Sequence, residues 1–102
     1  MRESQVEAYL VKQVKLAGGA TRKLRWLCRN GAPDRVVLFG DGTLVFVEVK
    51  RPGGRVRLEQ KLEHDDLRKL GQTVLVIETL EAVDELINAK TKSLPPKRDS
   101  LR

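Results

Sequence analysis

The amino-acid sequence predicts an α/β domain in which a mixed central sheet is flanked by helices. Three segments repeat apolar residues at helical spacing, and four shorter segments between them are rich in β-branched and aliphatic residues. Their order along the chain is α-β-β-β-α-β-α. The 102 residues suffice for one compact domain but hardly for two. A core of this size leaves no room for an enclosed organic-cofactor cavity, so any active site should be shallow and open.

The first helix is predicted from near Ser4 to the glycine pair 18–19, which ends its apolar pattern. Residues 22–28 then alternate between apolar and mainly basic side chains, as half-buried strands do. The apolar side of this strand consists of Leu24, Trp26 and Cys28. We therefore expect Trp26 and Cys28 to lie in the core.

A hairpin is predicted from two β-branched runs, residues 34–39 and 43–50, joined by a glycine-rich turn centred on Asp41. In that register Asp34 lies opposite Glu48. A slip by one residue would place the two acids on opposite faces of the sheet, and the apolar pattern does not exclude it. The second run is apolar on both faces, so we expect it to be the central strand.

A second helix, marked by leucines, is predicted to end at Gly71, followed by a strand at residues 73–77 and a third helix through Ile87. The folded domain is expected to span residues 1–88. Residues 89–102 lose this periodicity and gain proline, serine and charge, which predicts a disordered basic tail. The tail accounts for a net +4 of the chain's +6, so the folded part is only mildly basic.

The central strand ends in the sequence Val47-Glu48-Val49-Lys50, which places an acid and a base on one face. Asp34 would face Glu48 at a Cβ separation of roughly 4.5 to 5.5 Å, where like charges repel. A Mg²⁺ or Mn²⁺ ion between the carboxylates would offset the repulsion. Lys50 would then orient or deprotonate a water molecule and stabilise charge on a phosphate. The alternative is a plain salt bridge between Glu48 and Lys50.

Pro33-Asp34, a hairpin, and an acid and lysine two residues apart on a central strand together resemble the PD-(D/E)xK nuclease superfamily. Residues 31–38 and 45–54, followed by a helix that begins near Gln60, resemble its VRR-NUC family. The resemblance implies a restriction-endonuclease-like core and a structure-selective DNA endonuclease dependent on Mg²⁺ or Mn²⁺. Short stand-alone members resemble homodimeric Holliday junction resolvases, so the expected partners are branched DNA and a second copy of the chain.

Carried to this chain, the resemblance implies two metal ligands and a catalytic lysine: Asp34, Glu48 and Lys50. The family also has an acid on its first helix, for which Glu3 and Glu7 compete, and Glu7 is favoured because it lies within the regular helix. Gln60 matches a family glutamine and would hold a water molecule or a catalytic carboxylate. His64, one turn later among acidic residues, is expected at the surface without a role.

Basic residues flank the predicted site, and few aromatic residues are available for base stacking, so we expect DNA recognition through shape and phosphates. The expected phosphate contacts are Lys23, Arg35, Arg51, Arg55 and Arg57. The rival interpretation is a non-catalytic nucleic-acid-binding module, which would not need Asp34, Glu48 and Lys50 together.

The single cysteine excludes a disulfide within the chain, and together with the single histidine it excludes a four-ligand zinc site of Cys and His from one subunit. The sequence contains no apolar run of roughly 18 residues, and its first residues are too polar to open a signal peptide. We therefore expect a protein of the reducing cytoplasm that does not contact membranes.

Overall fold

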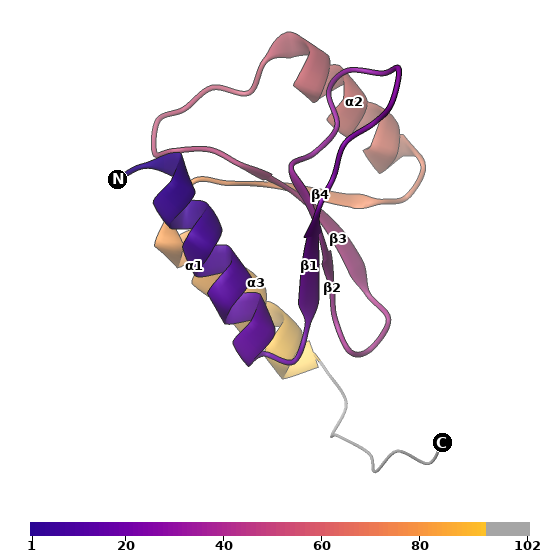
Figure 1. Ribbon diagram of the computed structural model, residues 1–102. Helices are drawn as coiled ribbons and strands as arrows, with labels where there is room; N and C mark the ends of the chain where they lie inside the picture. Colours follow the sequence, from indigo (N-terminus) through magenta and orange to yellow (C-terminus); the bar gives the residue numbers. More distant parts are fainter. Residues whose placement is uncertain (94–102) are drawn as a thin grey trace.

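A four-stranded sheet forms the centre of the fold, with strand order β1-β2-β3-β4 (Figure 1). The computed structural model describes residues 1–93. Its elements are α1 (Glu3–Leu16), β1 (Ala20–Lys23), β2 (Arg35–Leu38), β3 (Leu44–Val49), α2 (Leu58–Lys69), β4 (Thr73–Ile77) and α3 (Leu80–Ser93). Strands β1 to β3 pair antiparallel, and β3 pairs parallel with β4 through the α2 crossover. The predicted order of elements and the mixed sheet are thus confirmed.

The β2–β3 hairpin has the predicted register. Val36 pairs with Phe46, and the last pair of the ladder is Arg35 with Val47. Asp34 and Glu48 are therefore the next residues along the two strands, which excludes the slipped register. Because β3 also pairs with β4 on its other edge, it is the interior strand that its apolar sequence predicted.

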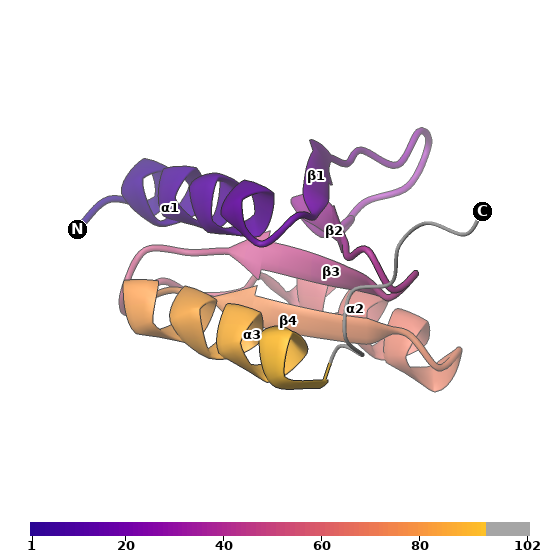
Figure 2. The same ribbon diagram turned by 90° about the horizontal axis from the view of Figure 1, so that it is seen from below.

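The two faces of the sheet are covered differently. Helices α1 and α3 lie side by side on one face, and α2 lies on the other (Figures 1 and 2). The α1 and α3 face holds the apolar core, to which α1 contributes Val6, Leu10 and Val14, and β3 contributes Val45, Val47 and Val49. Burial of these aliphatic side chains supplies most of the hydrophobic stabilisation of the fold.

Helix α2 turns its polar side toward the sheet. Its buried residues are Gln60, Glu63 and His64, whereas Leu58 and Leu62 are exposed. A helix normally buries its leucines. Here Gln60 and His64 instead lie against Glu48 at the end of β3, and Glu63 is hydrogen-bonded to the segment between β1 and β2. This polar layer between α2 and the sheet positions the candidate site.

Two segments differ from the sequence prediction. Strand β1 ends at Lys23 instead of Cys28, and Cys28 is exposed with a positive φ of 59°, so its predicted core position is wrong. The cause is tertiary, because Trp26 and Arg29 after β1 are hydrogen-bonded to Glu63 of α2. Helix α3 extends through Ser93, beyond the predicted domain end at residue 88; residues 94–102 of the predicted tail lie outside the described part of the chain. Within residues 1–93, no helix is long and apolar enough to cross a membrane.

Candidate active site

Glu48 is a buried carboxylate at the end of β3, only 1% exposed, on the face that α2 covers. The Gln60 side-chain amide donates a hydrogen bond to Glu48 Oε2 at 2.8 Å, and Lys50 Nζ lies 3.3 Å from the same oxygen. The other oxygen, Oε1, has no hydrogen-bond partner among the described residues. The polar groups around this buried acid thus bind one of its oxygens and leave the second without a hydrogen bond from the described residues.

The surroundings of Glu48 disfavour its negative charge. Burial is the main cause, and the charge of Asp34 adds to it, while Lys50 and Gln60 act in the opposite direction. Together they raise the pKa of Glu48 to about 7. A cation beside Glu48 Oε1 would stabilise the ionised form.

Asp34 is oriented toward the same end of β3. Its Oδ2 accepts a hydrogen bond from the Val49 backbone N–H at 2.8 Å, and its backbone carbonyl accepts one from Leu24 N–H at 2.9 Å. The structure therefore brings together Asp34, Glu48, Lys50 and Gln60. Two carboxylates placed in this way are an oxygen donor set suited to a hard divalent cation such as Mg²⁺ or Mn²⁺.

Gln60 holds Glu48 and also begins helix α2. Its Oε1 accepts a hydrogen bond from the Arg57 backbone N–H at 2.9 Å, while its Nε2 donates to Glu48. One of the free N–H groups at the helix start is thereby satisfied. The position of the helix start and the position of the Glu48 carboxylate are therefore fixed by one side chain.

His64 lies under the site and not at the surface, so its predicted exposure is wrong. It is 1% exposed, and its Nε2 lies 3.8 Å from Glu48 Oε1, with no hydrogen-bond partner in the described part of the chain. Burial, followed by the charge of Arg68, lowers the pKa of the imidazole. The sequence signal was its spacing: His64 follows Gln60 by four residues and so shares its helix face.

Glu7, the favoured helix-one acid, is occupied by two basic residues. Arg35 Nε donates to Glu7 Oε2 at 2.7 Å, and Lys23 Nζ lies 3.7 Å from the same oxygen. Glu3 is exposed. Among residues 1–93, no three His, Cys, Asp or Glu side chains gather as a metal-binding group. The described residues thus bring Asp34 and Glu48 together, whereas Glu7 on α1 is in an ion pair with Arg35.

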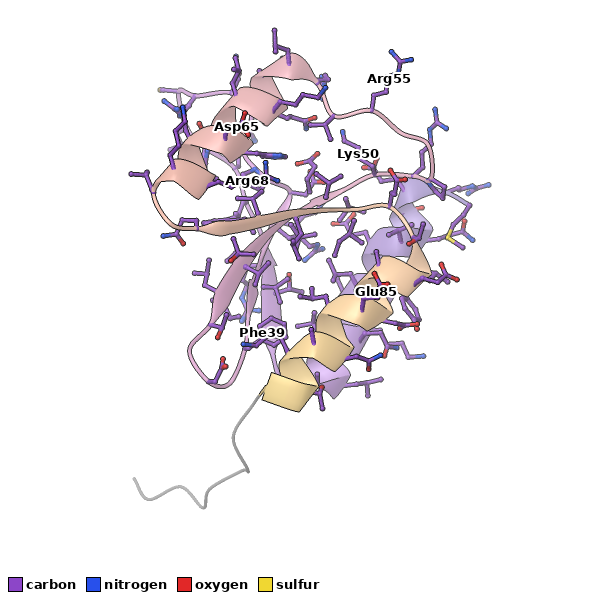
Figure 3. All side chains as sticks on the ribbon, turned by 180° about the vertical axis from the view of Figure 1, so that it is seen from behind. Phe39, Lys50, Arg55, Asp65, Arg68 and Glu85 are labelled. Carbon is purple, nitrogen blue, oxygen red and sulfur yellow. The ribbon has the colours of Figure 1, made fainter. Side chains whose placement is uncertain are left out.

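The basic residues predicted to bind DNA fall into two groups. Arg35 and Lys23 both contact Glu7; the Arg35 side chain is only 15% exposed, whereas that of Lys23 is 71% exposed. Arg51, Arg55 and Arg57 are exposed on the segment between β3 and α2. In Figure 3, Arg55 projects outward from this segment, whereas Lys50 points into the space between α2 and the sheet.

An open cleft of about 630 Å³ adjoins the site. Asp34 and Gln60 line it, together with three arginines: Arg25, Arg29 and Arg57. Arg25 and Arg29 are not among the predicted DNA contacts, although they belong to the same basic stretch of the sequence as Lys23 and Arg35. Asp34 and Glu59 also line the cleft, and Arg29 is paired with Glu63. Arg25 and Arg57 are therefore the cationic groups there that suit a phosphate backbone.

The residues between β1 and β2, here called the β1–β2 loop (residues 24–34), are fastened to α2. Glu63, 6% exposed, accepts a hydrogen bond from Trp26 Nε1 at 2.7 Å on one oxygen and from Arg29 on the other. The Trp26 ring also meets Phe46 edge to face, with centroids 6.4 Å apart. Trp26 is thus half-buried in a loop, not part of a strand.

Gly31 brings this loop into contact with the backbone of α2. It has a φ of 91°, and a Cβ at this position would collide with the backbone carbonyl of Glu59. We expect Gly31→Ala to lower the free energy of unfolding by about 2 kcal/mol or more, measured by urea denaturation. Gly42→Ala is the matched control, because Gly42 has the same φ with open space around it. Equal losses in both variants would contradict the close contact.

The chain is similar to known proteins over most of its length. It is 38% identical over 79 residues to the protein named "Putative nuclease p44" of Acyrthosiphon pisum secondary endosymbiont phage 1, a match that covers 78% of this chain and 85% of the phage protein. A 50-residue segment, 49% of this chain, is 44% identical to UPF0102 protein gll3754 of Gloeobacter violaceus and covers 39% of it. A solved VRR_NUC domain superposes with a TM-score of 0.79 at 36% identity, covering 84% of this chain and 94% of that domain. No family model matches the chain.

Proposed function

This chain belongs to the VRR_NUC family of nucleases, and from that premise we propose that it is a Mg²⁺- or Mn²⁺-dependent endonuclease that cuts branched DNA. The observation that supports metal dependence is Glu48: a buried acid with a raised pKa and one oxygen without a partner among the described residues. Such a group is costly in a fold unless a cation compensates it. The residues present therefore fit the ion.

In this proposal Asp34 and Glu48 hold the cation, and Gln60 keeps Glu48 in place by its hydrogen bond to Oε2. The cation would polarise the scissile phosphate and neutralise charge that develops on it. Lys50 adds a positive charge from the chain itself, because its ammonium group lies 3.3 Å from Glu48 and is only 13% exposed. Shielding from water strengthens its interaction with an incoming phosphate.

The DNA would lie across the cleft beside α2. Arg25, Arg29 and Arg57 line that cleft, and the exposed Arg51 and Arg55 extend the cationic surface. These side chains suit phosphate contacts, which are independent of base sequence. For a four-way junction, the two symmetric incisions would come from a homodimer with one site in each copy. Glu7 would join the metal ligands only if it left Arg35.

Incubation of the purified protein with a four-way junction and with linear duplex, each in Mg²⁺, Mn²⁺ or EDTA, tests this function. We expect incision of the junction in either metal, weaker incision of the duplex, and none in EDTA. Light scattering of the junction complex is expected to give two copies of the chain. Incision that survives EDTA would refute the metal-dependent chemistry, and salt-dependent binding without incision in either metal would favour the non-catalytic binding module.

A further inference from the structure

We propose that Leu27 is an apolar wedge that the β1–β2 loop inserts between bases at the branch point of the DNA. The inference rests on the proposed function and adds the element that would distinguish branched from continuous DNA. Four observations lead to it: the exposure of Leu27, its place in a projecting loop, the anchoring of its neighbours, and the cationic cleft beside it.

Leu27 is 84% exposed, the most exposed of the large apolar side chains in the described part of the chain. It precedes Cys28, whose φ of 59° turns the backbone sharply. Figure 1 shows the β1–β2 loop rising alongside α2, and Figure 2 shows it extending beyond β1 and β2, away from α1. An isolated aliphatic side chain at such a place does not add to the core.

The loop that presents Leu27 is held on both sides of it. Trp26 donates to Glu63 and packs on Phe46, and Arg29 donates two hydrogen bonds to the other oxygen of Glu63. Arg29 and Trp26 lower the pKa of Glu63, with Arg29 the larger cause, so the carboxylate is ionised at neutral pH. A loop fixed in this way loses little conformational entropy when it meets a ligand, which is what a wedge needs.

The position of the loop relates the wedge to the site of cutting. The same loop ends at Asp34, and its residues Arg25 and Arg29 line the cleft together with Asp34 and Gln60. Arg29 is paired with Glu63, so the exposed Arg25 is the guanidinium group of this loop that suits a phosphate beside an inserted side chain. The lining includes Trp26 and Cys28, the two neighbours of Leu27, but not Leu27 itself. Leu27 would therefore meet bases just outside the cleft that holds the cut phosphate.

The chemistry of an aliphatic wedge explains a preference for branches. Proteins that insert leucine or similar side chains between bases must separate stacked neighbours, at a cost of a few kcal/mol for each step. At a branch point the bases still stack within their own arms, but the stack is interrupted between arms, so the cost of separating neighbours is lower. The wedge thus favours branched DNA without reading the base sequence.

The test places 2-aminopurine, whose fluorescence rises when it unstacks, at the branch point of a four-way junction and, in a second probe, within linear duplex. Binding is followed without divalent metal, so the readout does not depend on incision. We expect the protein to raise the fluorescence of the junction probe several-fold. Leu27→Ser should abolish the rise and lower the junction-over-duplex cutting ratio by about tenfold, whereas Leu27→Met should retain both.

Leu16→Ser is the matched control, because Leu16 is 70% exposed on α1, on the opposite face of the sheet from α2. It should change neither readout. If the original chain and Leu27→Ser give the same fluorescence, or if neither raises it, the proposed role of Leu27 is refuted even if the junction is cut. If the protein binds the junction but never cuts it, the proposed function fails while the fluorescence comparison still decides the role of Leu27. A protein that does not bind the junction refutes both.

Discussion

Replacing Lys50 by alanine is expected to lower the rate of DNA cleavage by about 100- to 1,000-fold while leaving the fold and the DNA affinity intact. Lys50 Nζ lies 3.3 Å from Glu48 Oε2 in a largely shielded position. In such a position the attraction between a positive charge and the phosphate is stronger than it is in water. Because the charge acts mainly on the transition state, its removal should appear in the rate and hardly in binding.

Single-turnover cleavage of a labelled junction measures the rate, and binding in EDTA measures the affinity. Lys69→Ala is the control, because Lys69 is an exposed lysine at the end of α2. Circular dichroism should show the same helix content in both variants. A Lys50→Ala protein that cuts within a few-fold of the original rate would show that Lys50 only forms a salt bridge.

Replacing Glu48 by glutamine is expected to abolish cleavage and yet stabilise the metal-free protein at high pH. The folded-state pKa of Glu48 is raised from 4.5 to about 7. The folded chain thus binds a proton that the unfolded chain has released in this window, and stability falls as pH rises from about 4.5 through 7. Above about pH 7, the ionised buried carboxylate lowers the free energy of unfolding by up to about 3 kcal/mol. The neutral amide of glutamine avoids this loss.

Thermal unfolding at pH 5 and pH 8, with and without Mn²⁺, gives the measurement. Without metal, Glu48→Gln should melt several degrees higher than the original chain at pH 8, and the difference should shrink toward pH 5. Mn²⁺ should raise the melting temperature of the original chain at pH 8, because the ion binds the ionised carboxylate, and should barely affect the variant. A variant less stable at pH 8, or equally stabilised by Mn²⁺, would contradict the buried, metal-ready acid.

The sequence was sufficient to predict the parts of the fold that depend on local periodicity. The glycine-rich turn centred on Asp41 predicted the register of the β2–β3 hairpin, although the apolar pattern left a one-residue slip open. That register brings Asp34 and Glu48 to neighbouring positions. Glu48 and Lys50 on one face of β3 followed from the two-residue period of a strand. Gln60 could be placed beside them only through the resemblance to the VRR-NUC family.

Features that depend on contacts between distant segments could not be predicted. Cys28 alternates correctly for a strand, but the hydrogen bonds of Trp26 and Arg29 to Glu63 pull these residues into a loop. His64 stands among acids as a surface residue would, yet α2 turns its polar face inward because the sheet end it covers is polar. The Glu63 contacts join residues more than 30 positions apart, so no local pattern encodes them. For His64 the local signal was only its spacing from Gln60, and its burial depends on contact with β3.

The double duty of Gln60 limits how this protein can evolve. Its amide accepts from the Arg57 backbone at one atom and donates to Glu48 at the other. An acid here could replace only the acceptor, and a lysine only the donor. Substitutions at this position are therefore selected against both through folding and through catalysis. In a lineage that no longer cuts DNA, selection for the hydrogen bond to the Arg57 backbone would remain.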